Sequence, residues 1–133
     1  MTAPKLPLSL FIIRVTLVAF FLVWAFEKIL LPGNSLGVFE NFYASSPPLG
    51  VIRILGGVQA LIALAALAGL FRFWTYGALL LMHTVSTVAS YAQLMDPYSG
   101  PNHLFWAAIP TLGALIALML MRREDTLFTL GGR

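Results

Sequence analysis

Residues 8–31 read LSLFIIRVTLVAFFLVWAFEKILL, an apolar stretch whose only charged residues are Arg14, Glu27 and Lys28. A helix needs about 20 residues to cross a hydrocarbon core that is about 30 Å thick. Three more stretches of this kind occur at about residues 49–70, 73–95 and 103–121. None of the four alternates polar and apolar residues as membrane barrel strands do, and lipid excludes open sheets. We therefore predict an all-α, polytopic membrane protein, a bundle of four transmembrane helices.

The composition of the whole chain agrees with a membrane protein. Its 133 residues suffice for a single domain, and 59% of them are hydrophobic while 10% are charged. The mean hydropathy is +0.89. A small soluble fold buries too little of its surface to hide so many apolar side chains, so the composition argues against a cytosolic enzyme, a nucleic-acid-binding protein and a disordered chain. The absence of cysteine excludes thiolate catalysis and disulfide exchange by this chain.

The lysines and arginines predict the orientation of the bundle. With four spans both chain ends lie on one side, which then holds six of the eight basic residues: Lys5, Arg14, Arg72, Arg122, Arg123 and Arg133. Because cytoplasmic segments carry an excess of basic residues, we expect both termini in the cytoplasm. This distribution explains the net charge of +3 without a nucleic-acid partner. The first stretch is too long for a signal peptide and ends on charged residues with no small-residue cleavage site.

The segments between the spans predict the two surfaces of the bundle. Residues 32–48 form the longer outer loop, in which apolar residues recur at near-helical spacing: Leu36, Phe39, Phe42 and Tyr43. They predict a short amphipathic helix on the outer membrane surface, with an aromatic-rich interfacial loop as the alternative. Residues 96–101 form the second outer loop, and Phe71 and Arg72 make a tight inner turn. We expect the short tail after Arg122 to be solvated.

Small residues and one proline indicate helix contacts and a kink. Gly56 with Ala60 in the second span, and Gly113 with Ala117 in the fourth, lie four positions apart. This spacing lets helices approach closely in lipid. Pro110 predicts a kink in the fourth span.

The charged residues of the first span have two explanations each. Arg14 and Lys28 are 14 positions apart, close to four helical turns, so they share a face of the helix. Arg14 either extends to the inner headgroups or forms a pair inside the bundle. Glu27 and Lys28 either anchor the helix at the outer interface or belong, with Arg53, to a charged rim that faces protein or a wet cavity.

The third span carries a polar stripe at helical spacing, formed by His83, Ser86, Thr87, Ser90 and Gln93. We expect this stripe to face the bundle, because facing lipid would be costly. His83, near the middle of the span, either bonds across helices, for example to Gln59, or contacts a ligand or relays protons. His103 opens the fourth span about 18 Å above it, at 1.5 Å per residue. The two therefore do not share a metal ion, and we predict no metal site.

Two segments resemble the DoxX/DoxD-like family of membrane proteins. FIIR at residues 11–14 and WAFEK at residues 24–28 are similar to the two ends of the family's first helix, which has an arginine near its start and a lysine near its end. RILGGVQ at residues 53–59 and AGL at residues 68–70 resemble its second helix and inner turn. The resemblance implies a four-helix bundle in a bacterial or archaeal plasma membrane.

The resemblance also implies a range of functions. Some members of the family are subunits of thiosulfate:quinone oxidoreductase, and the methylamine-utilisation membrane protein MauE is a relative. The wider group looks similar in architecture to the quinone-reducing enzymes that form disulfides, whose cysteines this chain lacks. Members often have an acidic residue where Gln59 stands.

These observations favour a membrane subunit of a quinone-linked redox system, although no catalytic residue is assigned. In this interpretation His83 and Gln59 contact a non-covalently held quinone, and the charged candidates pair around it: Arg14, Glu27, Lys28 and Arg53. The first alternative is a non-catalytic scaffold or assembly partner for another membrane or periplasmic protein. The second is a small transporter or proton path between His83 and Asp96, with a continuous wet path through a homo-oligomer.

Overall fold

The computed structural model describes residues 5–131, and every regular element in that part of the chain is a helix. In chain order the elements are α1 (Lys5–Leu30), α2 (Pro32–Phe42), α3 (Leu49–Leu67), α4 (Arg72–Ala89), α5 (Tyr91–Leu94), the 3-10 helix η1 (Asn102–Ala107) and α6 (Ala108–Leu120). The predicted all-α class is therefore confirmed for the described residues.

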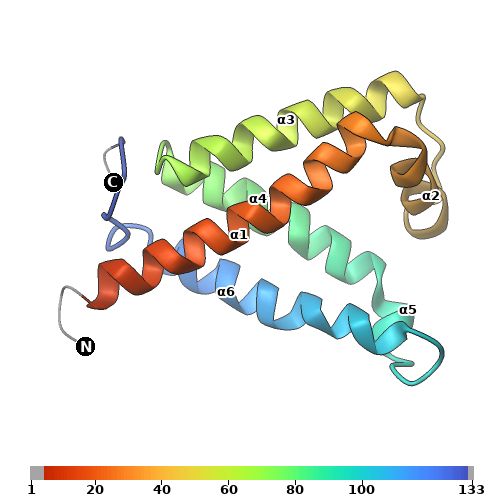
Figure 1. The fold of residues 1–133 in the computed structure, drawn as a ribbon. Helices are drawn as coiled ribbons and strands as arrows, with labels where there is room; N and C mark the ends of the chain where they lie inside the picture. Colours follow the sequence, from red (N-terminus) through yellow and green to blue (C-terminus); the bar gives the residue numbers. More distant parts are fainter. Residues whose placement is uncertain (1–4, 132–133) are drawn as a thin grey trace.

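The long helices pack as two crossing pairs (Figure 1). α1 lies beside α3, and α4 lies beside α6. Their shared core contains Leu17 and Phe21 of α1, Tyr76 and Leu79 of α4, and Leu118 of α6. The start of α1, the turn between α3 and α4, and the segment after α6 meet at one end of the molecule, which we call the inner end. At the opposite, outer end lie α2, α5 and η1.

Three helical segments are long and apolar enough to cross a membrane: α1, α3 and the continuous stretch of η1 and α6, Asn102–Leu120. The third predicted span, residues 73–95, is not among them. It consists of two helices, because α4 ends at Ala89 and α5 begins at Tyr91. α4 has 18 residues, and Arg72, His83 and several hydroxyl side chains lower its hydropathy.

The other predicted spans differ from the helices mainly at their ends. The second span ends at Leu67, and the next residues form the inner turn, where Phe71 has a left-handed backbone (φ 47°). The fourth span begins with the 3-10 turns of η1. Pro110 has no N–H group to donate to the carbonyl four residues earlier, and the tighter 3-10 turns precede it. The 3-10 turns therefore lie at the outer end of the segment, and a kink at Pro110 stays a prediction.

The outer loop contains the predicted short helix, α2. It begins at Pro32, and Leu31 alone separates it from α1. A proline is well suited to the first turn of a helix, where no N–H bond is required. At the other end of α2 the ring of Phe42 lies 5.8 Å from the ring of Phe105 in η1. This contact connects the helix of the first outer loop to η1.

Small residues let α1 and α3 approach closely. A Cβ atom on Gly56 would lie 2.7 Å from Cβ of Lys28 and 2.8 Å from the carbonyl oxygen of Ala25, well inside van der Waals contact. Ala25 and Ala63 are fully buried in the same interface. The predicted small-residue contact is thus used in α3, whereas Gly113 of α6 is exposed and has no neighbour within 4 Å of its missing Cβ.

The prediction of a solvated tail is wrong. Asp125, five residues beyond α6, is fully buried, and the backbone N–H of Leu130 donates to the carbonyl of Ala68 at 2.8 Å. Gly69 (φ +71°) makes this docking possible, because a Cβ atom there would lie 2.6 Å from Cγ2 of Thr129. The tail therefore packs against the turn between α3 and α4.

Candidate functional site

His83 lies in the middle of α4 and is held between α1 and α6. The residue is 6% exposed, and Nε2 lies 2.9 Å from the carbonyl oxygen of Ala108. The rings of Phe20 and Phe21 pack edge-on against it, with centroid distances of 5.8 and 6.4 Å. The expected bond across helices therefore exists, but its partner is a backbone carbonyl of α6 and not Gln59.

This contact places a proton on Nε2 of the imidazole ring. A carbonyl oxygen accepts hydrogen bonds only, so Nε2 carries the proton and donates it to Ala108. In the neutral ring Nδ1 then presents a lone pair. Within the described residues Nδ1 has no hydrogen-bond partner. His83 can therefore accept a hydrogen bond from a group that approaches this nitrogen.

An open, largely apolar groove of about 300 Å³ lies between α1 and α6, lined by Ile13, Thr16, Leu17, Phe20, Pro110, Thr111 and Ala114. The two threonines do not make it polar, because Thr16 donates to the carbonyl of Ile12 and Thr111 to that of Ala107, each at 2.8 Å. Phe20 lines the groove and also contacts His83. It is thus a shared wall between the groove and the imidazole.

The polar stripe around His83 is divided between two faces of α4. Thr87 is buried beside His83 and donates to its carbonyl at 2.7 Å. Ser86, expected to face the bundle, is instead exposed, and Ser90 donates to the carbonyl of Ser86 at 3.0 Å. The hydroxyls of Thr87 and Ser90 are satisfied by their own helix, and Ser86 faces away from the bundle, so these three residues need no ligand.

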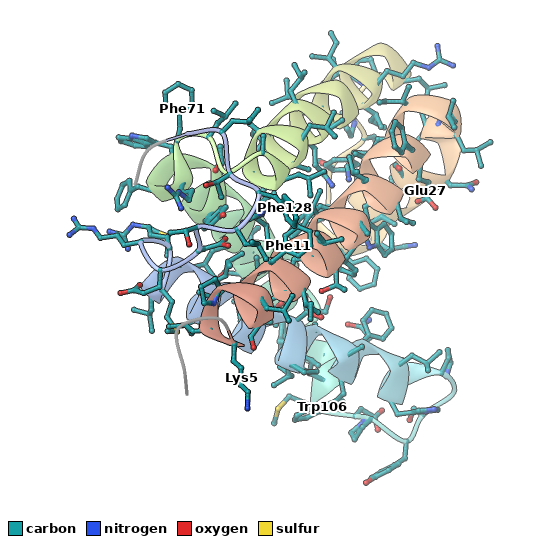
Figure 2. The ribbon with its side chains drawn as sticks, turned by 60° about the vertical axis from the view of Figure 1, so that its left-hand side comes forward. Lys5, Phe11, Glu27, Phe71, Trp106 and Phe128 are labelled. Atoms are coloured by element: carbon teal, nitrogen blue, oxygen red, sulfur yellow. The ribbon has the colours of Figure 1, made fainter. Side chains whose placement is uncertain are left out.

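The outer candidates form a separate group. Nζ of Lys28 donates to Oε1 of Gln59 at 3.0 Å, and Nε2 of Gln59 donates to the carbonyl of Phe21 at 2.9 Å. These bonds use the amide of Gln59 to connect α3 to α1. Arg53 is exposed at the start of α3, and Glu27 lies half-buried at the outer end of α1 (Figure 2).

Arg14 belongs to a third group, at the inner end. Nη1 donates to Oδ1 of Asp125 at 2.5 Å, and both side chains are fully buried. Nη2 donates to the carbonyls of Leu127 at 2.6 Å and Phe128 at 3.2 Å. The ring of Phe128 lies 5.1 Å from that of Phe11 (Figure 2). Of the two explanations for Arg14, the structure shows the pairing inside the bundle.

The same carboxylate is bound from α4. The hydroxyl of Tyr76 donates to Oδ2 of Asp125 at 2.6 Å. Arg72, which is 2% exposed, donates through Nη1 to the carbonyls of Arg122, at 3.2 Å, and of Asp125. Sequence reasoning missed Asp125 and Tyr76. One signal was available, since only two of the five acidic residues, Glu124 and Asp125, fall on the predicted inner side.

The six candidate residues therefore do not form one site. His83 lies at mid-helix beside the groove, Gln59 and Lys28 bond to each other nearer the outer end, and Arg14 pairs at the inner end. Comparison of the chain with protein-family models, curated proteins and solved structures finds no match.

Proposed function

We propose that this chain is an integral membrane subunit of a redox system that binds a quinol in the groove between α1 and α6. The proposal rests on the imidazole of His83. Its Nε2 donates to the carbonyl of Ala108, which leaves Nδ1 as a hydrogen-bond acceptor. The ring of Phe20 lines the groove and contacts this imidazole. The apolar groove suits an isoprenoid tail. His83 does not line the groove, so a quinol hydroxyl would reach Nδ1 when the ring of Phe20 turns aside. This assignment agrees with the resemblance to DoxX-like proteins.

Binding by the reduced form follows from the direction of the hydrogen bonds. The only ring proton of a neutral His83 is used by Ala108, so the imidazole has no donor for a quinone carbonyl. It does have an acceptor for a quinol hydroxyl. Oxidation of the quinol to the quinone releases two protons and two electrons. Nδ1 would take the proton of one hydroxyl, the second hydroxyl would release its proton to water, and a redox-active partner protein would accept both electrons. His83 would then act as a proton acceptor.

The proposal includes four membrane crossings. Arg14 near the start of α1 pairs with Asp125 beyond the end of α6, so these two segments lie on the same side. Three crossings would separate them, whereas a fourth crossing by α4 and α5 keeps them together. Three of the groups that make α4 less hydrophobic, Arg72, His83 and Thr87, are buried, and the hydroxyl of Thr87 bonds within its own helix. We infer a plasma-membrane protein with both ends in the cytoplasm.

The test compares the two histidines of the chain. Purified protein is titrated with a short-chain quinol and with its oxidised quinone, as wild type, His83→Ala and His103→Ala. One net hydrogen bond contributes about 0.5–1.5 kcal/mol, so His83→Ala should weaken quinol binding about two- to tenfold and affect the quinone less. His103, exposed before α6, serves as the control. Saturable quinol binding that is equal in all three proteins would reject the role of His83, and no saturable binding would reject the function.

A second candidate function is that of a scaffold for another membrane protein. It is favoured by α6, where only Leu115 and Leu118 are buried and Gly113 is exposed with open space above it. A small-residue face of this kind suits a second transmembrane helix. Gly113→Leu should then release a partner that co-purifies with the wild type from native membranes. Retention of the same partner by Gly113→Leu would argue against this face.

A further inference from the structure

The two walls of the groove are joined at one end and apart at the other. α1 and α6 meet near the inner end, and their outer parts diverge, so that Glu27 and Trp106 lie far from each other (Figure 2). At the inner end Arg14 of α1 bonds to Asp125, Leu127 and Phe128 of the tail that follows α6. The polar connection between the walls is therefore concentrated at one position of α1.

The tail itself is held by other residues. Arg72 donates to three of its carbonyls, those of Arg122, Asp125 and Gly131. Leu130 donates its backbone N–H to Ala68 in the turn between α3 and α4. These bonds do not involve α1 or the carboxylate of Asp125. The tail is thus a platform fixed to α4 and to the inner turn, and Arg14 attaches α1 to it.

We propose that the Arg14–Asp125 ion pair is a clasp that sets the separation of α1 from α6, and with it the width of the groove. Ile13 and Leu17, which line the groove, flank Arg14 on α1. Arg14 and Asp125 are positioning residues and do not touch the ligand. The role of the clasp in ligand binding rests on the proposed function, whereas its role in helix spacing does not.

The physical basis is the directionality of this contact in lipid. Apolar helix faces gain no hydrophobic energy from each other in a membrane, so packing and polar bonds decide their arrangement. Apolar side chains such as Leu17 and Leu118 can shift relative to each other because their contacts have no direction. A buried guanidinium must stay within hydrogen-bond distance of its carboxylate. If the carboxylate is neutralised, Arg14 is left as a buried charge without a counter-ion. It then moves toward the inner surface and carries the start of α1 with it.

The test measures helix separation directly. Because the chain has no cysteine, spin labels can be attached at Val23→Cys on α1 and Leu104→Cys on η1, which are 69% and 66% exposed. Their distance is measured by pulsed electron paramagnetic resonance in lipid. Asp125→Asn should shift or broaden the distance distribution, whereas the matched control Glu124→Gln, at an exposed neighbour, should leave it unchanged. An unchanged distribution in Asp125→Asn overturns the clasp.

A second variant keeps the test possible if the Asp125→Asn protein does not fold. Arg14→Met with Asp125→Leu removes both charges and leaves no buried charge unpaired. It should shift the distance as well, and a distribution equal to that of the wild type overturns the proposal. Quinol titration of the same variants separates the two claims. If the label distance shifts but no protein of the series binds quinol, the clasp is retained and the proposed function is rejected. If the proteins bind quinol but the distance does not shift, the function is retained and the clasp is rejected.

Discussion

Arg14 and Asp125 lie 111 positions apart in the chain and form a fully buried ion pair, with 2.5 Å between Nη1 and Oδ1. The hydroxyl of Tyr76 donates to the second carboxylate oxygen, so one acidic side chain connects α1, α4 and the tail. This relationship brings both ends of the described chain to the inner end. The tail therefore packs into the core between the helices. Its contribution to the free energy of unfolding can be measured by substitution of Asp125.

Loss of the carboxylate should destabilise the protein strongly. Asp125→Asn leaves the guanidinium of Arg14 buried without a counter-ion, which typically lowers the free energy of unfolding by about 3–5 kcal/mol. Glu124→Gln removes the same charge from an exposed side chain and should change the stability by less than about 0.5 kcal/mol. Thermal denaturation in detergent compares the two. Equal midpoints for both variants would show that the pair contributes no stability.

Removal of both partners should cost less than removal of one. Arg14→Met combined with Asp125→Leu eliminates the buried charge as well as the pair, and apolar replacements of buried ion pairs are often neutral or stabilising. We therefore expect the double variant to denature at a higher temperature than Asp125→Asn. The double-mutant cycle is completed with Arg14→Met and Asp125→Leu alone. Additive losses in this cycle would contradict a direct interaction between the two side chains.

Gly56 should tolerate no side chain, in contrast to its neighbour. Gly56→Ala would place Cβ 2.7 Å from Cβ of Lys28 and push α1 away from α3, with a cost of about 1–3 kcal/mol for overpacking. A Cβ atom on Gly57 would have no neighbour within 4 Å, so Gly57→Ala should be neutral or slightly stabilising. Thermal denaturation of the two variants decides. A stable Gly56→Ala protein would mean that the two helices are not packed so closely.

The number of crossings is open to a labelling test in cells. Single cysteines replace Lys5 and Leu130 at the inner end and Tyr98 in the outer loop, all of which are exposed. A maleimide that does not cross membranes, added to intact cells, should label Tyr98→Cys and leave Lys5→Cys and Leu130→Cys unlabelled until the cells are opened. If Lys5→Cys and Leu130→Cys are labelled from opposite sides of the membrane, the chain crosses it an odd number of times, for example three.

The fold was predictable where one local property decides it. The apolar stretches define α1, α3 and α6 because burial or lipid contact requires long apolar helices, and the near-helical spacing of Leu36, Phe39 and Phe42 predicts α2. The break at Ser90 was not predictable, since no proline or glycine stands there. Ser86 was assigned to the wrong surface because helical spacing shows which residues share a face but not how wide the buried part of that face is.

The candidate sites depended more on tertiary contacts. His83 was recognisable as a polar group within an apolar run, but its bond to Ala108 depends on how α4 packs against α6. Asp125 lies beyond the last apolar stretch, where an acidic residue normally faces water. Only the docking of the tail at Gly69 brings it to Arg14, and a contact between residues so far apart leaves no periodic pattern in one sequence.

Quinol binding in the groove is tested by photolabelling with an azido-quinol in native-like lipid, followed by mapping of the labelled peptides. We expect the label to attach to residues 13–20 of α1 and 110–114 of α6, the two walls of the groove. Excess unlabelled quinol should compete the label away, and His83→Ala should reduce it while His103→Ala does not. Label that is distributed over the lipid-facing helices, resists competition and is unaffected by His83→Ala would contradict quinol binding at this site.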